Sequence, residues 1–317
     1  MDLLRKGVTV LVRKGPLDFL REVRRFVYAR RIKGTEMLDT CAICGSDSID
    51  LFLRERPSSL YRCDKCGLIF YNPLPSKDAL RKYYSSEEGY LPSIRETARA
   101  HRENYVNHEK RYKGFIDRIL KGTDNHRRIL DIGCGYGFFL SYCRERGFEP
   151  FGIEVSEQTS TWARAQGLNV FTGTIHEAPF HEGFFDVVTS FHCLEHALDP
   201  KAEILKISSL CKKGGLFLLA IPNAGSLVAE YSFAAWKWKS WPNHLFYFSP
   251  ENLRILLNKA GFKIVEIYSQ AGDSDFNDDR RLLAKQASMK NEDEEAVLDQ
   301  LYNSNKGQEL VVLSENK

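Results

Sequence analysis

From Arg128 onward the sequence alternates short apolar runs with helix-like segments, and this alternation restricts the fold more than any other feature. Consecutive parallel strands need a crossover of about a dozen or more residues, which the helix-like segments provide. We expect strands at 128–133, 150–156, 169–173, 184–192, 216–222, 262–270 and 309–314. The expected helices are 77–84, 95–120, 137–147, 156–167, 199–215 and 249–261. The pattern predicts an α/β fold, a doubly wound and mostly parallel sheet with helices on both faces.

The other segments divide the chain into four parts. Residues 1–37 are a basic, amphipathic helical extension, 38–75 hold two cysteine pairs, and 76–125 are a helical linker or cap. Residues 126–317 are the α/β domain, in which 222–250 form an aromatic-rich insert after the fifth strand. The acidic, polar segment before the last strand is expected to be a helical excursion or a loop.

Composition is that of a soluble globular protein, with 43% hydrophobic and 27% charged residues. A formal net charge of +3 is too small to indicate nucleic acid. No apolar run approaches the ~20 residues that span a bilayer. Basic residues interrupt the apolar pieces near the N-terminus, unlike in a secretory signal. We therefore expect a cytoplasmic protein whose eight cysteines are thiols or metal ligands.

The first 33 residues carry ten Lys or Arg and three acids, and apolar residues recur at helical spacing after Pro16. One interpretation is a helix that contacts the inner face of a membrane peripherally, or an anionic partner. The other, which we favour, is a helix docked on its own protein or on a second subunit. The oligomeric state is not predicted.

Two cysteine pairs indicate a metal site. Cys41 and Cys44 form one C-x2-C knuckle, and Cys63 and Cys66 form a second after eighteen intervening residues. A glycine follows each knuckle, where the backbone must turn sharply. Four thiolates suit tetrahedral Zn²⁺ and leave no open position, so we expect structural zinc in a small ribbon.

The loop after the first strand points to a ligand without phosphates. A dinucleotide loop has glycines at positions 1, 3 and 6, whereas Gly133, Gly135 and Gly137 stand at 1, 3 and 5. Asp131 inside the preceding strand would repel a pyrophosphate but attract an ammonium group. Glu154, at the tip of the next strand, suits the two hydroxyls of a ribose. The three features together favour S-adenosylmethionine.

These motifs resemble those of the class I S-adenosylmethionine-dependent methyltransferases, which have a Rossmann-like fold. The resemblance rests on "ILDIGCGYGFFL", "GIEVS" and "FDVVTSFHCLEHALDP", and extends over roughly 38–270. The segment "CAICGS…YRCDKCGLIFYNPLPSKDALRKYY" is similar to the N-terminal zinc ribbon of a bacterial subgroup. Some members of that subgroup methylate sugars, and many act in polysaccharide or natural-product pathways.

The resemblance implies roles for individual residues. Gly133, Cys134, Gly135 and Gly137 would line the methionine end of the cofactor, with Asp131 near its amino group and Glu154 on the ribose. Thr174 and Ile175 would flank the adenine. Phe191 and His192, at the tip of the fourth strand, would face the sulfonium; ordinary core packing is the alternative for Phe191.

A hydroxyl acceptor must lose a proton on methylation, and histidine is the natural base near neutral pH. The candidates are His244 in the insert, where the superfamily builds a substrate lid, and His192 and His196, which share a face if they form a helical turn. For His196 we favour a structural hydrogen bond. The insert's aromatic residues are expected to stack on a sugar or close over the cofactor. They are Trp236, Trp238, Trp241, Phe246, Tyr247 and Phe248.

We expect a methyltransferase that O-methylates a sugar, glycan or related small-molecule hydroxyl. Sugar C-methylation is less favoured, because "WPNH" (241–244) lacks the tyrosine, first histidine and glutamate of the Tyr-His-Glu-His run in related C-methyltransferases. A second hypothesis is an RNA methyltransferase that grips RNA with its ribbon and basic N-terminus. The third is a scaffold that binds a protein partner without catalysis. DNA is not expected as a partner.

Overall fold

The computed structural model describes residues 23, 27–103, 105–121, 128–271 and 294–317. Most of the basic extension therefore lies outside the described residues, as does much of the acidic segment before the last strand. None of the helices in the described parts is long and apolar enough to cross a membrane.

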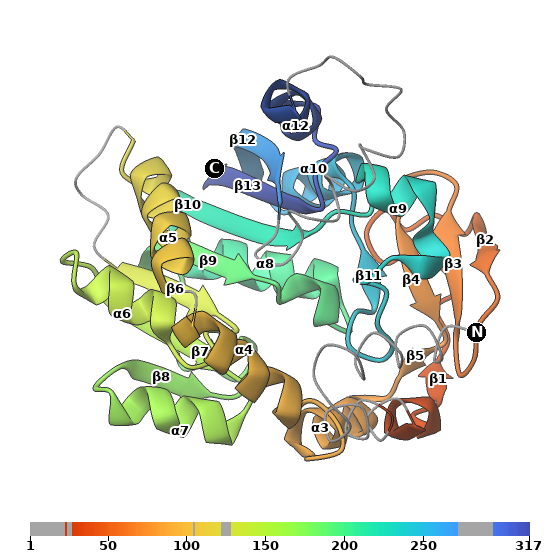
Figure 1. Cartoon of the computed structure of the whole chain (residues 1–317), viewed down its shortest axis with the longest axis horizontal. Helices are drawn as coiled ribbons and strands as arrows, with labels where there is room; N and C mark the ends of the chain where they lie inside the picture. The colour runs from red at the N-terminus through yellow and green to blue at the C-terminus, as the bar shows by residue number, and fades with distance from the viewer. Residues whose placement is uncertain (1–22, 24–26, 104, 122–127, 272–293) are drawn as a thin grey trace.

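A seven-stranded sheet forms the centre of the protein, in the order β12-β13-β10-β9-β6-β7-β8 (Figure 1). The strands are β6 (Arg128–Ile132), β7 (Glu149–Glu154), β8 (Asn169–Thr172), β9 (Phe185–Phe191), β10 (Cys211–Pro222), β12 (Phe262–Gln270) and β13 (Glu309–Asn316). Neighbouring strands from β8 to β10 pair in parallel, whereas β13 runs antiparallel to both β10 and β12. This is the mostly parallel, doubly wound sheet that the alternation predicts, and the last strand inserts between two earlier ones.

Helices cover both faces of the sheet. On one face, α5 (Tyr105–Ile119) and α6 (Phe138–Arg144) bury Phe115, Ile119 and Phe139 against β6, β9, β10 and β13. On the other, α8 (Pro200–Leu210) and α10 (Pro250–Lys259) bury their leucines and isoleucines. The helix α7 (Glu157–Ala165) begins at Ser156, whose side chain accepts from the Thr159 backbone N–H, a cap that stabilises the first turn.

The stretch expected over 95–120 is covered by α4 (Leu91–Glu103) and α5, and residue 104 between them lies outside the described residues. One helical expectation differs from the structure. The helix expected over 199–215 ends at Leu210, where Cys211 pairs with Phe185 and the chain enters β10. Gly214 has a left-handed φ of 73°, which an α-helix does not accommodate. Gly214 and Gly215 therefore belong to the irregular start of β10.

The cysteine segment and the insert share a second sheet, in the order β11-β4-β3-β2. Its strands are β2 (Ile49–Leu53), β3 (Ser59–Cys63), β4 (Ile69–Asn72) and β11 (Phe246–Tyr247). A smaller pair is formed by β1 (Gly34–Glu36) and β5 (Leu74–Pro75), before α3 (Lys77–Ser85). Between β10 and β11 lie α9 (Leu227–Tyr231) and the short helix η2 (Phe233–Ala235), and α12 (Glu294–Asn303) precedes β13.

The ribbon and the α/β domain are packed into one core. Leu60, Leu68 and Phe70 of the ribbon belong to the same buried cluster as residues of β9, β10, α8 and α10. Most of the insert's aromatic side chains lie in this core: Trp236, Phe246, Tyr247 and Phe248 are all buried. The described end of the N-terminal extension also docks on its own protein, because Trp241 Nε1 donates to the carbonyl oxygen of Ile32 at 3.1 Å.

Candidate cofactor and active site

The glycine loop connects β6 to α6 through three left-handed residues. Gly133, Gly135 and Gly137 have φ angles of 72°, 53° and 72°, a region that other residues rarely adopt. A Cβ on Gly137 would lie 2.4 Å from Leu168 Cδ1, so this glycine also permits close packing of the loop against the neighbouring helix and strand. A Cβ on Gly135 would meet no atom within 4 Å. The loop therefore leaves open space at its centre, where a ligand can approach the backbone.

Asp131 is buried at the C-terminal half of β6. Thr189 on the adjacent strand β9 donates its hydroxyl to Asp131 Oδ1 at 2.7 Å. Burial raises the pKa of Asp131 to about 7, although the Thr189 hydrogen bond opposes the rise and the Glu154 carboxylate adds to it. No cation neutralises the carboxyl group among the described residues. An ammonium group placed beside it would favour its ionised form.

Glu154 holds the glycine loop against the end of β7. Its Oε2 accepts from the Gly135 N–H at 2.9 Å and its Oε1 from the Ser156 N–H at 2.8 Å. Burial raises the pKa of Glu154, and these backbone bonds lower it. A carboxylate offers about four lone-pair positions, so two remain for ribose hydroxyls. Thr174 and Ile175 follow β8 beside it, since the Gly173 N–H donates to the Glu154 carbonyl oxygen at 3.0 Å.

His192 lies just beyond β9 with a left-handed φ of 51°, an uncommon conformation for a residue with a side chain. Its Nε2 is 2.5 Å from Glu309 Oε1, and its Nδ1 is 3.6 Å from Glu195 Oε1. Burial disfavours the charged ring, but these two carboxylates outweigh it and raise the pKa of His192 to about 9. His192 is therefore an imidazolium at neutral pH, with Nε2 donating to Glu309.

His196 and His244 make different hydrogen bonds. The ring nitrogens of His196 face two carbonyl oxygens, Asn243 at 2.6 Å from Nδ1 and His192 at 2.9 Å from Nε2. Both ring nitrogens of His196 are therefore occupied by backbone carbonyl oxygens. His244 donates Nδ1–H to the Trp238 carbonyl oxygen at 2.6 Å. Burial and the neighbouring His196 lower the pKa of His244 to about 3, which leaves Nε2 with a free lone pair at neutral pH.

Glu195 lies among the three histidines on the turn η1 (Leu194–His196). Both of its carboxylate oxygens are buried without a hydrogen bond among the described residues, and Oε1 is 3.9 Å from the Nε2 atoms of both His196 and His244. Burial raises the pKa of Glu195, but the histidines hold it at about 2. Glu195, His196 and His244 lie close enough to ligate a cation. Because both nitrogens of His196 are bonded to carbonyls, the arrangement fits an acid–base cluster better than a metal centre.

Aromatic rings frame this cluster. Trp238 is sandwiched between His192 and His244, with ring centroids 5.2 and 5.8 Å away and interplanar angles of 11° and 13°. Tyr84, which is on α3, meets His196 edge-on at 6.4 Å. Phe191 stacks on Phe115 at 4.8 Å and so contributes to the core beneath the site.

The four cysteine thiols come together as their spacing predicts. The ligand atoms of Cys41, Cys44, Cys63 and Cys66 all lie within 4.8 Å of one another. The N–H groups of Gly45 and Gly67 donate to the carbonyl oxygens of Cys41 and Cys63, and both glycines are left-handed, so each knuckle turns as its glycine suggests. Lys259 at the end of α10 donates to the carbonyl oxygens of Ile43 and Cys44. The cluster therefore sits against the α/β domain.

The family described as "Methyltransferase domain" matches residues 101–267, just over half of the chain. The chain belongs to this family. The protein is an S-adenosylmethionine-dependent methyltransferase of class I, as the glycine loop and its neighbouring carboxylates predict. Its sheet order and its inserted antiparallel last strand are those of the expected Rossmann-like fold.

Similar proteins include curated bacterial methyltransferases. A ubiquinone biosynthesis O-methyltransferase of Idiomarina loihiensis is 27% identical over 167 residues, which cover 49% of this chain and 68% of that one. The protein of the same name from Bordetella avium is 27% identical over 183 residues, covering 50% and 76%. A solved SAM-dependent methyltransferase from Archaeoglobus fulgidus is 21% identical, with a TM-score of 0.47, and the match covers 67% of this chain and 100% of that one.

Two carboxylates of the site were not among the predicted residues. Glu195 stands between His192 and His196 in "FHCLEH", so a polar residue inside a motif already singled out was the available signal. Glu309 opens the last strand, 117 positions from His192, and nothing local marks it. Only the insertion of β13 beside β10 brings it to the site.

Proposed function

We propose that this methyltransferase O-methylates a small-molecule hydroxyl, with His244 as the base. The observation that carries the proposal is a difference among the three histidines. His192 is charged between two carboxylates, and both ring nitrogens of His196 face backbone carbonyl oxygens, whereas His244 Nε2 has a free lone pair beside Glu195. The curated relatives are named as O-methyltransferases of a small-molecule pathway, which supports a small hydroxyl acceptor. None of those names supports a sugar in particular, so the acceptor class is proposed more broadly than the sequence suggests.

We also propose the cofactor-binding roles that the resemblance to class I methyltransferases implies. Asp131 would take the ammonium group of S-adenosylmethionine, Glu154 the ribose hydroxyls, and Thr174 and Ile175 the adenine. When bound, the cofactor supplies an electrophilic methyl group on a sulfonium. Gly133 and Gly135, together with Cys134, would line its methionine end, because the loop around Gly135 leaves room for a ligand against the backbone.

A weak base is sufficient for O-methylation. The cofactor would supply the methyl group and would keep the electron pair of its carbon–sulfur bond, and the acceptor oxygen would form the new bond to carbon. The acceptor O–H becomes strongly acidic as the oxygen gives up electron density, so its proton passes to His244 Nε2, and Glu195 stabilises the imidazolium that forms. Removing a proton from carbon needs a much stronger base than an imidazole with a pKa of about 3. The cluster therefore favours O- over C-methylation.

The ribbon gives little support to RNA as the acceptor. Residues 38–75 contain five acids and four bases, a formal charge of −1 before any thiolate is counted. RNA binding relies on neutralising phosphates with clustered cations. Most of the basic N-terminal stretch lies outside the described residues.

We also propose that the four cysteines bind one structural Zn²⁺. Four thiolates within reach of one point are the ligand set that zinc prefers, and they leave no position for a substrate. The metal would fasten the two knuckles together, and β4, which follows the second knuckle, pairs with β11. It would therefore support the insert that carries His244.

The test is methyl transfer from methyl-deuterated S-adenosylmethionine to two pools, a small-molecule metabolite extract and total RNA, read by mass spectrometry. We expect label on an oxygen of a small molecule. His244→Ala should lower turnover by about 100-fold or more, the usual contribution of a general base, with S-adenosylhomocysteine affinity unchanged. The control His181→Ala, on an exposed loop, should retain activity. Label on RNA nucleosides or on carbon, or full turnover of His244→Ala, would contradict the proposal.

A further inference from the structure

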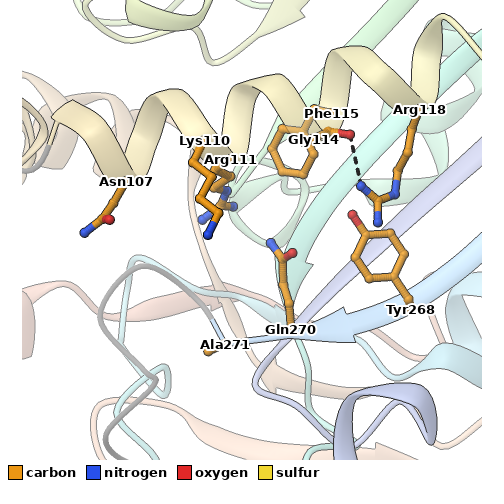
Figure 2. Close-up of a pocket in the computed structure, with 9 residues that line it drawn as sticks. All are labelled: Asn107, Lys110, Arg111, Gly114, Phe115, Arg118, Tyr268, Gln270 and Ala271. Carbon is orange, nitrogen blue, oxygen red and sulfur yellow. Dashed lines mark hydrogen bonds between the residues drawn. The ribbon is translucent and has the colours of Figure 1, made fainter. Parts of the chain in front are cut away.

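A cavity of about 260 Å³ lies between α5 and the end of β12 (Figure 2). Asn107, Lys110 and Arg111 extend from the helix toward the strand, and Tyr268 and Gln270 face them from β12. The cavity lies at the edge of the central sheet where β12 ends, and the parallel strands end at the same edge. Ligands of such sheets bind in crevices beyond the carboxyl ends of the strands.

Charges are sorted on α5. Lys110, Arg111 and Arg118 line the cavity, and no acidic residue in the described part of the chain does. The acids of the helix pair elsewhere: Glu109 with Arg146, and Asp117 with Lys113. A helix that only needed a solvated surface would have no reason to place all its acids away from one face. Because Arg111 pairs with Glu309 and Arg118 with Glu266, the uncompensated positive charge that suits an anion is that of Lys110.

Two of the three cations are held in place by their surroundings. Arg118 donates to the Gly114 carbonyl oxygen at 3.0 Å, lies 4.3 Å from the Tyr268 ring centroid, and pairs with Glu266 at 3.2 Å. Arg111, whose side chain is 13% exposed, bonds to Glu309 Oε1 at 2.6 Å. Lys110, by contrast, is exposed and makes no hydrogen bond or ion pair that holds it among the described residues.

The cavity connects to the histidine cluster through buried contacts. Glu309 accepts from Arg111 on the cavity side and from His192 on the other. Gln270 also lines the cavity, and its Nε2 donates to Glu309 Oε2 at 2.6 Å. Phe115 forms part of the wall and stacks on Phe191 at the tip of β9. A molecule anchored here is thus one layer of side chains from the proposed methyl-transfer site.

We propose that this cavity binds an anionic group, a phosphate or carboxylate, on the small molecule that is methylated. The inference rests on the proposed function and narrows its acceptor class. Lys110 would bind the anion as a mobile point charge, while Arg111 and Arg118 would donate from fixed positions and the Asn107 amide from the exposed rim. The buried Glu309 keeps the Arg111 side chain at the cavity.

The experiment is a calorimetric titration of the full chain, saturated with S-adenosylhomocysteine, with matched pairs of probes. The pairs are phenyl phosphate against phenol, and glucose 6-phosphate against glucose. We expect the phosphorylated member of at least one pair to bind at least about tenfold more tightly than its neutral partner, as a charge-assisted contact provides. The pair that shows the difference indicates whether the rest of the acceptor is aromatic or a sugar.

Variants of α5 provide the control. Lys110→Ala should weaken phosphate binding about tenfold and Lys110→Arg should restore most of it. Lys113→Ala also removes one positive charge from α5, but Lys113 pairs with Asp117 and does not line the cavity, so this variant should bind phosphate almost as tightly as the unmodified protein. Equal affinity for charged and neutral probes, or equal losses in the Lys110 and Lys113 variants, would overturn the proposal. Failure of S-adenosylhomocysteine itself to bind would instead refute the proposed function.

Discussion

Cofactor affinity should depend on pH through Asp131. In the empty site burial raises the pKa of this carboxyl group to about 7, so most of it is protonated below neutral pH. The ammonium group of S-adenosylhomocysteine favours the ionised form, and binding must therefore release a proton at low pH. By linkage, affinity rises with pH below about 7 and levels off above it.

The magnitude follows from the fraction of Asp131 that is ionised in the empty site. With a pKa of about 7, that fraction is roughly 3% at about pH 5.5 and roughly three quarters at about pH 7.5. If the complex requires the carboxylate, the dissociation constant of S-adenosylhomocysteine should fall about 25-fold over this interval. Calorimetry in buffers of different ionisation enthalpy would measure both the affinity and the proton released.

Two comparisons make the prediction specific. 5′-Methylthioadenosine lacks the ammonium group but keeps the ribose, so its affinity should change much less with pH. Any pH dependence that comes from Glu154 should appear with both ligands. The hydroxyl of Thr189 lowers the pKa of Asp131, so Thr189→Val should move the inflection upward by about one pH unit. A flat affinity between about pH 5.5 and 7.5, or an equal rise for 5′-methylthioadenosine, would refute the reasoning.

Three other predictions concern stability and metal content. Glu309→Gln leaves Arg111 and His192 without their buried counter-charge, so urea denaturation should show that the free energy of unfolding falls by about 3 kcal/mol. A decrease under about 1 kcal/mol would argue against the pairing. Gly137→Ala places a side chain at a left-handed φ and against Leu168, so the free energy of unfolding should fall by roughly 2–4 kcal/mol. Gly183→Ala has a similar φ but open space around it, and should lower the free energy of unfolding by only about 1–2 kcal/mol. Elemental analysis should find one zinc per chain, reduced in Cys44→Ser but retained in Cys211→Ser, and equal zinc in both variants would disprove the assignment.

Local patterns predicted the parts of this protein that depend on neighbouring residues. The alternation after Arg128 gives the sheet because each strand and crossover helix is encoded by its own segment. The cysteine knuckles form as their spacing suggests, since each pair needs only one tight turn. The glycine loop, with Asp131 and Glu154 around it, follows from one strand-loop-helix unit and the next strand.

Long-range pairing accounts for what the sequence did not reveal. The two residues of β11 pair with β4, and a strand of that length has no periodicity to recognise. The pairing draws the insert into the ribbon's sheet and buries aromatic residues that we expected over the substrate. The roles of the three histidines also depend on distant partners, because Glu309 adds to the nearby Glu195 in raising the pKa of His192, and the Trp238 carbonyl sets the tautomer of His244. Spacing within "FHCLEH" cannot distinguish these states.

A crystal structure of the protein with S-adenosylhomocysteine would test the central claim most directly. We expect its ammonium group within hydrogen-bond distance of Asp131, both ribose hydroxyls on Glu154, and the sulfur atom facing the cluster of His192, Glu195 and His244. A ligand bound with its ribose away from Glu154, or with its sulfur turned away from that cluster, would contradict it.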